Sequence, residues 1–117
     1  MVINFLIRPP LFFKDGKAYF ADVPKDTELQ PDPPAGGQRW TKWKKANLAY
    51  FKRHLEGENK SKIILDLGAG GAPFREILRD FETVIGLDFY PYRNVAVVSD
   101  LTEPLPLKNN SCDIVFT

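Results

Sequence analysis

Cysteine and histidine are nearly absent from this chain, which has one of each among its 117 residues. A single cysteine, Cys112, forms no internal disulfide and supplies no multi-cysteine zinc site, and we expect it to be a small, packed side chain. The single histidine, His54, has no evident nucleophile beside it, which disfavours a hydrolase triad. No P-loop lysine follows the glycines at residues 68–71, which disfavours hydrolysis of a nucleoside triphosphate.

Long apolar runs and an excess of one charge are also missing. No segment approaches the roughly eighteen apolar residues of a membrane span. The apolar start at residues 1–13 has no basic leader and is interrupted by Pro9 and Pro10, unlike a signal peptide. A net charge of +1 gives the whole molecule no bulk attraction to nucleic acid or to membranes. We therefore expect a cytoplasmic protein that does not associate with membranes.

Composition divides the chain into two expected regions, residues 1–37 and 38–117. In the first, "FFKDGKAYF" predicts a β-hairpin, because Asp15 and Gly16 tolerate the positive φ that a tight hairpin turn requires. Residues 23–37 hold four prolines and two glycines, which predicts an irregular connection.

The second region opens on a segment with helical spacing and a strong positive charge. Its apolar residues recur on one face and predict a helix over 40–56: Trp40, Trp43, Leu48, Phe51 and Leu55. Residues 38–62 carry eight basic and two acidic side chains. One interpretation is a basic, aromatic surface at 38–55 that binds RNA, a protein or another polyanion. The interpretation we favour is an amphipathic helix that covers a sheet and leaves its lysines in water.

From residue 62 onward the pattern is that of an α/β fold. Apolar runs at 62–67, 83–88, 94–100 and 112–117 predict strands, and residues 72–81 predict a helix. Because the runs are continuous and do not alternate with polar residues, the strands should be buried on both faces, as in a parallel sheet. We expect about four core strands with flanking helices, preceded by the N-terminal hairpin and the amphipathic helix.

Each of the first three expected strands ends in an acid, at Asp66, Asp88 and Asp100. Ligands of open parallel sheets bind at the carboxyl ends of the strands. Asp88, 22 residues after Asp66, is placed to accept hydrogen bonds from a ribose diol. Asp66 beside the glycine turn would repel a pyrophosphate and favour an ammonium or sulfonium group, and Asp100 suits the amino group of adenine. Together these groups describe S-adenosylmethionine.

The order of these motifs resembles the cofactor-binding half of the class I, Rossmann-like S-adenosylmethionine-dependent methyltransferases, and most of all their type 11 branch. "ILDLGAGGAPF" is similar to the first motif of that family, and "VIGLDFYP" to its acidic second-strand motif. "VSDLTEPLPLKNNSCDIVFT" is similar to the stretch through the third and fourth strands. The resemblance covers residues 63–117 and implies methyl transfer to an acceptor, which we expect to be a small molecule.

The resemblance also implies roles for individual residues. The first motif would hold the methionine part of the cofactor through the Asp66 carboxylate and the backbone of Gly68, Ala69 and Gly70. Asp88 would bind the ribose, with Phe89 packing on the adenine. Asp100 would accept from the adenine amino group and the Leu101 amide would face the ring. The third small position of the family is Ala72 here, with the extra glycine displaced to Gly71, and Asp113 would open the fourth strand without a catalytic part. Neither a catalytic residue nor a metal site is indicated.

Several alternatives stay open at this point. The glycines could simply turn a strand into a helix, Asp88 could form a turn, and Asp100 could cap one. An NAD-dependent oxidoreductase fragment shares the glycine turn and the ribose acid, and a noncatalytic module could bind an adenosyl cofactor or a protein. A fourth strand left as an exposed apolar edge predicts self-association through that edge or a fragment of a longer chain.

Overall fold

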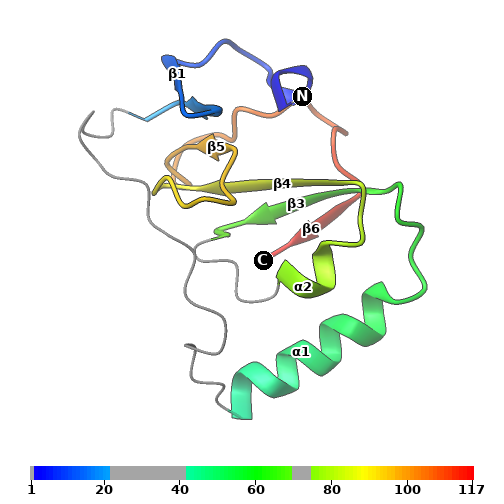
Figure 1. Cartoon of the computed structure of the whole chain (residues 1–117). Helices are drawn as coiled ribbons and strands as arrows, with labels where there is room; N and C mark the ends of the chain where they lie inside the picture. Colours follow the sequence, from blue (N-terminus) through cyan, green and yellow to red (C-terminus); the bar gives the residue numbers. More distant parts are fainter. Residues whose placement is uncertain (1, 22–41, 70–74) are drawn as a thin grey trace.

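A computed structural model of the chain describes residues 2–21, 42–69 and 75–117. Its helices are the 3-10 turn η1 (Val2–Phe5), the long α1 (Lys42–Leu55) and the single-turn α2 (Arg75–Leu78). Its strands are β1 (Phe12–Lys14), β2 (Lys17–Tyr19), β3 (Ile63–Leu67), β4 (Thr83–Asp88), β5 (Val97–Val98) and β6 (Ile114–Phe116). Figure 1 shows the strands forming a sheet with α1 and α2 beneath it.

The six strands form one sheet in the order β1-β2-β5-β4-β3-β6. Only the β1–β2 pair is antiparallel, and the other four pairings are parallel. The order β5-β4-β3-β6 places the third, second, first and fourth strands of the predicted core side by side, which is the order of a doubly wound sheet. A mostly parallel α/β architecture is therefore confirmed.

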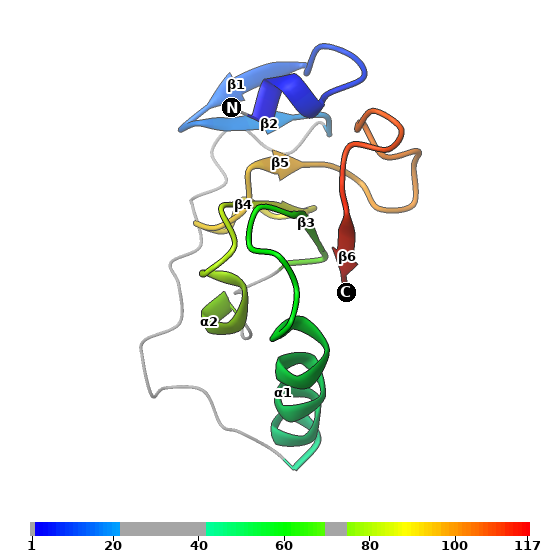
Figure 2. The same ribbon diagram turned by 90° about the vertical axis from the view of Figure 1, so that its right-hand side faces the viewer.

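The N-terminal hairpin is part of this sheet and extends it beyond β5 (Figure 2). Its turn is the predicted one, with φ of 51° at Asp15 and 75° at Gly16, and Phe12 stacks on Tyr19 across the pair. We expected the hairpin to precede a sheet of about four strands. It instead pairs in parallel with β5, Ala18 opposite Val97, so that the sheet has six strands among the described residues.

Lys17 explains how the hairpin stays in this position. Its side chain is 5% exposed, and its Nζ donates to the carbonyl oxygens of Arg93, at 3.1 Å, and of Val95. A buried ammonium group is stable only when its hydrogen bonds are satisfied. The connection between β4 and β5 supplies those acceptors, and so it fastens the hairpin to the rest of the sheet.

Side chains pack on both faces of the sheet. On the helix side, Leu55 of α1 packs with Ile64, Leu78 and Phe81, and Phe51 lies 4.6 Å from the ring of Phe116. On the opposite face the buried set is Leu6, Ala18, Leu65, Ile85, Leu87 and Val97. Neighbouring residues of a strand point to opposite faces, so Ile64 and Leu65 belong to different layers.

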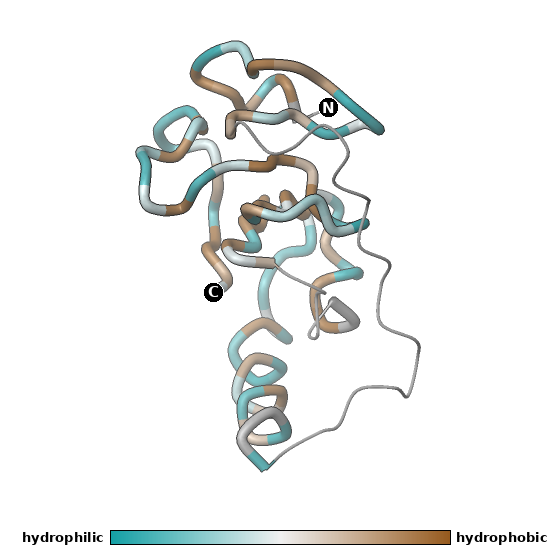
Figure 3. Tube along the Cα trace, turned by 90° about the vertical axis from the view of Figure 1, so that its left-hand side faces the viewer, coloured by the Kyte–Doolittle hydropathy of each residue, from teal (hydrophilic) through white to brown (hydrophobic). Residues whose placement is uncertain are grey.

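The predicted helix over 40–56 corresponds to α1, whose successive turns combine hydrophobic and hydrophilic residues (Figure 3). Its side chains at Lys42, Lys45, Lys52 and Arg53 are exposed while Leu55 is buried, as in an amphipathic helix. Trp40 lies outside the described residues, as does the start of the helix predicted over 72–81, of which α2 is the described part.

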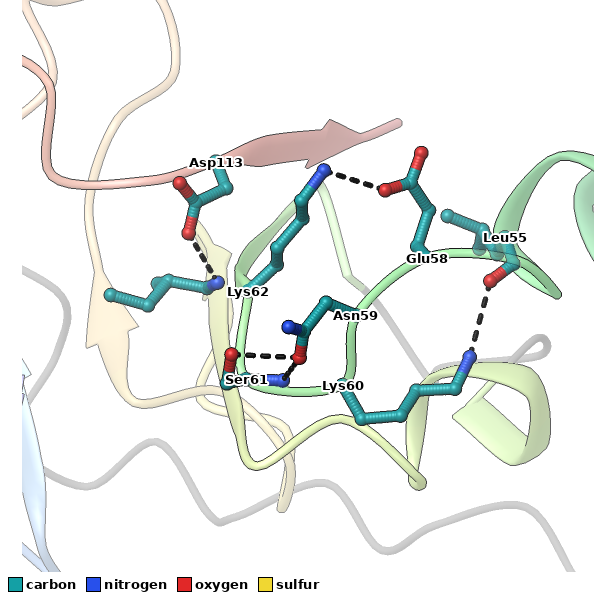
Figure 4. A network of polar contacts seen from close by, with 8 residues as sticks. Leu55, Glu58, Asn59, Lys60, Ser61, Lys62 and Asp113 are labelled. Carbon is teal, nitrogen blue, oxygen red and sulfur yellow. Dashed lines mark hydrogen bonds and ion pairs between the residues drawn. The ribbon is translucent and has the colours of Figure 1, made fainter.

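The turn that leads from α1 to β3 is held by a polar network (Figure 4). The Lys60 Nζ donates to the last carbonyl of α1, that of Leu55, at 3.1 Å. Asn59 Oδ1 accepts from the Ser61 amide and hydroxyl, and Lys62 pairs with Glu58 at 2.6 Å. These contacts fix the point at which β3 begins.

The connection between β4 and β5, residues 89–96, lies directly against β4. A Cβ atom added at Gly86 would overlap the carbonyl oxygen of Asn94 and lie 3.3 Å from the Cα of Val95. The Ala96 amide donates to the Gly86 carbonyl at 2.8 Å. β5 is consequently two residues long, Val97–Val98, whereas the apolar run predicted a strand over 94–100.

Among the described residues, β6 is the last strand at the other side of the sheet and pairs only with β3. The side chain of Val115 is 58% exposed there. The expected exposed apolar edge is therefore present at the fourth core strand. Self-association through it stays a prediction.

Candidate functional site

The three acids predicted from the strand ends lie at one edge of the sheet. β3, β4 and β5 run parallel, so their carboxyl ends point the same way (Figure 1). The Gly68 and Ala69 amides donate to the Leu87 carbonyl at 2.9 and 3.1 Å. The Ser99 amide donates to the Asp88 carbonyl at 3.0 Å. Backbone hydrogen bonds thus join the turn after β3, the end of β4 and the residues after β5.

Asp66 is the buried acid of this group, with 8% of its surface exposed. Burial, together with the negative charge of Asp88, raises the pKa of its carboxyl group from 3.8 to about 6. Both causes disfavour the ionised form. A cation bound beside Asp66 would remove this penalty, whereas an anion would increase it.

The turn after β3 brings the backbone close to the site. Gly68 has a φ of 70°, a conformation that residues with a Cβ rarely adopt. A Cβ at Gly68 would lie 3.9 Å from Cδ1 of Leu101, so the predicted residues of the first and third motifs are neighbours. Ala69 is buried, and Gly70 lies outside the described residues.

Asp88 is the last residue of β4, and Phe89 follows it. The Asp88 Oδ1 accepts from the Tyr90 amide at 3.1 Å, so this carboxylate does form a local turn, as one alternative interpretation expected. The Phe89 ring is 39% exposed and makes an edge contact with Tyr90 at 5.3 Å. An exposed aromatic ring beside a carboxylate offers a flat surface and a hydrogen-bond acceptor to the same ligand.

Asp100 also stabilises a turn. Its Oδ1 accepts from the amide and the hydroxyl of Thr102, at 2.9 and 2.6 Å. These bonds, the hydroxyl first, lower the pKa of the Asp100 carboxyl group below its usual value, and the carboxylate stays ionised near neutral pH. Both turn bonds use Oδ1, which places Oδ2 outside the turn. The predicted acceptor role and the local capping role are therefore compatible.

A cavity of about 450 Å³ opens beside these strand ends. Two of the predicted residues, Phe89 and Asp100, line it together with Ser99, Glu103 and Pro104. Asp66, Gly68, Ala69, Asp88 and Leu101 are not among its described lining residues. A second cavity, of about 410 Å³, lies between α1 and α2 and contains none of the predicted residues.

Three residues from the N-terminal region complete the wall of the first cavity: Arg8, Phe20 and Ala21. The sequence did not indicate them, because local turn chemistry predicts the hairpin but not the strand beside which it lies. One signal was available in "FFKDGKAYF". Its second strand has no charged residue after Lys17, which is typical of a strand with neighbours on both sides.

Asp113, in contrast, lies at the amino ends of the strands, at the opposite end from the three predicted acids. Its Oδ2 accepts from the Ile63 amide at 2.7 Å, and its own amide donates to the Ile63 carbonyl at 2.8 Å. These bonds align the beginnings of β3 and β6. This position agrees with a structural role for Asp113 at the opening of the fourth strand.

Comparison with known families identifies the family of the chain. A family model described as a hypothetical methyltransferase matches residues 37–117. The match covers more than half of the chain, and the chain therefore belongs to this methyltransferase family. No curated protein and no solved structure matches the chain. Among the described residues, no helix is both long enough and apolar enough to cross a bilayer.

Proposed function

We propose that this chain binds S-adenosylmethionine and belongs to an enzyme that transfers its methyl group to a small-molecule acceptor. Two findings support the proposal: the family match over residues 37–117, and the order β5-β4-β3-β6 with an acid at the carboxyl ends of three strands. The type 11 branch is part of the proposal, on the motif resemblance alone.

The observation that carries the proposal is the pair of neighbouring carboxylates, Asp66 and Asp88. Asp66 is buried and its pKa is raised to about 6 by burial and by the charge of Asp88. Such a group is costly to ionise unless a cation compensates it. The amino group of S-adenosylmethionine fits beside Asp66, whereas the pyrophosphate of NAD would place further negative charge there. This disfavours the oxidoreductase alternative.

The residues divide the work of holding the cofactor. Asp66 would bind its amino group, and the turn formed by Gly68, Ala69 and Gly70 would hold the methionine part of the cofactor through its backbone. Asp88 would accept hydrogen bonds from the ribose hydroxyls.

At the adenine end, Phe89 would pack on the base and Asp100 would accept from its amino group while the Leu101 backbone amide faces the ring. When bound, the cofactor supplies the reactive methyl group, and the protein provides position and exclusion of water. We assign no catalytic base.

The acceptor is proposed to be a small molecule, and the basic helix offers an alternative. Lys42, Lys45, Lys52 and Arg53 of α1 are exposed, as a polyanion-binding surface requires. The packing of α1 on the sheet explains its apolar face without any partner. An RNA or protein acceptor therefore remains a second candidate, and it predicts binding to RNA that weakens steeply with salt.

Calorimetric titration with S-adenosylhomocysteine tests the proposal. We expect saturable binding by the wild-type chain, a loss of at least about 100-fold in Asp88→Ala, and no binding of NAD. Asp80→Ala is the matched control, since Asp80 is exposed and lines the cavity between α1 and α2. Circular dichroism establishes that each variant is folded. A folded wild-type chain that does not bind S-adenosylhomocysteine would overturn the proposal.

A further inference from the structure

β2 brings a further strand end to the edge that carries the candidate site. β2 runs parallel to β5, with Tyr19 opposite Val98, so the residues that follow it emerge at the same edge as those that follow β5. The Phe20 amide donates to the Val98 carbonyl at 2.8 Å. This bond places Phe20 beside Ser99 and Asp100.

Arg8 is brought to the same place by a second set of backbone contacts. Leu6 forms a bridge with Leu107, and the Ile7 amide donates to the Pro106 carbonyl at 3.0 Å. The next residue is Arg8, whose guanidinium carbon lies 5.3 Å from the centre of the Phe20 ring. Backbone contacts therefore position both residues: Phe20 lies beside β5, and Arg8 lies beside residues 104–107.

The cavity between these walls combines aromatic surface with both kinds of hydrogen-bonding group. Phe20 and Phe89 both line it, Arg8 donates only, and the Asp100 carboxylate accepts only. A volume of about 450 Å³ is within the range of small-ligand pockets. An adenine ring matches this set, because its amino group donates, its ring nitrogens accept, and its faces stack on aromatic or guanidinium planes.

We propose that Arg8 and Phe20 form the outer wall of the adenine subsite and contact the base. The assignment rests on the proposed function, since it takes the ligand to be an adenosyl cofactor. The Phe20 ring packs against the base, and the Arg8 guanidinium, held over that ring, stacks on the base or donates to one of its ring nitrogens. The N-terminal hairpin would thus be a determinant of cofactor affinity.

The test measures binding of S-adenosylhomocysteine and of adenosine to Arg8→Ala and Phe20→Leu by calorimetry. We expect each variant to weaken both ligands about five- to tenfold. The loss should be equal for the two ligands, because adenosine contains the base but lacks the amino-acid part.

The controls are Arg79→Ala and Phe13→Leu, which make comparable changes at exposed positions just after α2 and on β1. We expect both to bind within about twofold of wild type, since an isolated exposed side chain contributes little. Phe20 is partly packed against the core, so binding by Phe20→Leu is interpreted only if this variant melts cooperatively. If it does not, the variant at the exposed Arg8 decides the question.

Wild-type affinity in Arg8→Ala, alongside binding lost in Asp88→Ala, would overturn the assignment and leave the proposed function intact. A variant that weakens S-adenosylhomocysteine but not adenosine would also overturn it, because Arg8 would then contact the amino-acid part. Failure of the wild-type chain to bind S-adenosylhomocysteine would instead overturn the proposed function, and this assignment with it.

Discussion

Asp113 lies at the amino end of β6, and Asp66 lies near the carboxyl end of the neighbouring strand β3. The surroundings of the two acids differ. Asp113 is exposed and accepts a 2.7 Å hydrogen bond from the backbone of Ile63 (Figure 4). Asp66 is buried beside a second carboxylate, and its pKa is raised to about 6. At the amino ends of the strands, an acid aligns two strands through hydrogen bonds. At the carboxyl ends, an acid is buried where its ionisation is unfavourable. A carboxyl group whose pKa is raised by burial and by a second carboxylate is typical of a binding site.

Gly86→Ala should have the largest effect on stability, because it disrupts the whole carboxyl edge. The added Cβ would overlap the Asn94 carbonyl and displace the connection over β4, which we expect to lower the free energy of unfolding by about 3 kcal/mol. Urea denaturation measures this. Gly57→Ala is the control, since a Cβ there meets nothing within 4 Å. Equal stability of the two variants would show that the connection does not pack as described.

Asp66→Asn should separate binding from stability. We expect S-adenosylhomocysteine to bind about 100-fold more weakly. The ligand-free variant should be more stable than wild type by about 1 kcal/mol at pH 7.5, because a neutral amide avoids ionisation in the buried site. Calorimetry and urea denaturation give the two quantities. A variant that lost stability would contradict the view that ionised Asp66 is costly.

The pH dependence follows from the same carboxyl group. Its native pKa of about 6 lies above its ordinary 3.8, so the stability contributed by the protonated form is fully present below pH 3.8 and is lost as the pH rises through about 6. Binding of the ammonium group needs the ionised form. We therefore expect affinity for S-adenosylhomocysteine to fall about fivefold between pH 6 and pH 5, and Asp66→Asn to lack this step.

Asp113→Ala should reverse the pattern of Asp66→Asn. Losing the bond to the Ile63 amide should lower the free energy of unfolding by about 1 kcal/mol, while affinity for S-adenosylhomocysteine stays within about twofold, because Asp113 lies at the far edge of the sheet. Glu103→Ala, at an exposed position of the cavity wall, is a useful contrast that should leave stability unchanged. Weakened binding in Asp113→Ala would contradict the division between the two edges.

The smallest effect on stability is expected at the edge strand. Val115→Lys places a charge on the exposed side chain of β6 and should change the free energy of unfolding by less than about 0.5 kcal/mol. It should reduce any self-association through this edge, since lysine blocks edge-to-edge pairing. Sedimentation velocity compares it with Val115→Thr, which keeps a β-branched residue. Identical self-association of the two variants would show that the chain does not associate through β6.

Much of the core sheet could be predicted from local pattern. The apolar run at 83–88 coincides with β4, and the turn residues Asp15 and Gly16 have the expected positive φ. β5 is shorter than its apolar run because the backbone at Asn94 and Val95 lies against Gly86. That contact depends on tertiary packing, which hydrophobicity alone does not encode.

The candidate site likewise has residues that the sequence predicts and residues that it does not. The positions of Asp66, Asp88 and Asp100 at one edge follow from strand ends in a parallel sheet. The hydrogen bonds of Asp88 with Tyr90 and of Asp100 with Thr102 are also of a kind that acids in turns commonly make. Arg8 and Phe20 could not be placed from the sequence, because they reach Asp100 only through pairings with strands and loops far along the chain.

The pairing of β2 with β5 also bears on the order of events during folding. The contact of Lys17 with Val95 joins residues 78 positions apart, so a long loop must close before the hairpin can attach. The hairpin itself forms within microseconds, whereas contacts of such separation in sequence form slowly. We therefore expect the hairpin to attach after β3 and β4 have paired. Refolding followed by stopped-flow fluorescence should then show adenosine binding recovering in the slowest phase, with the cavity as the last part of the native structure to assemble.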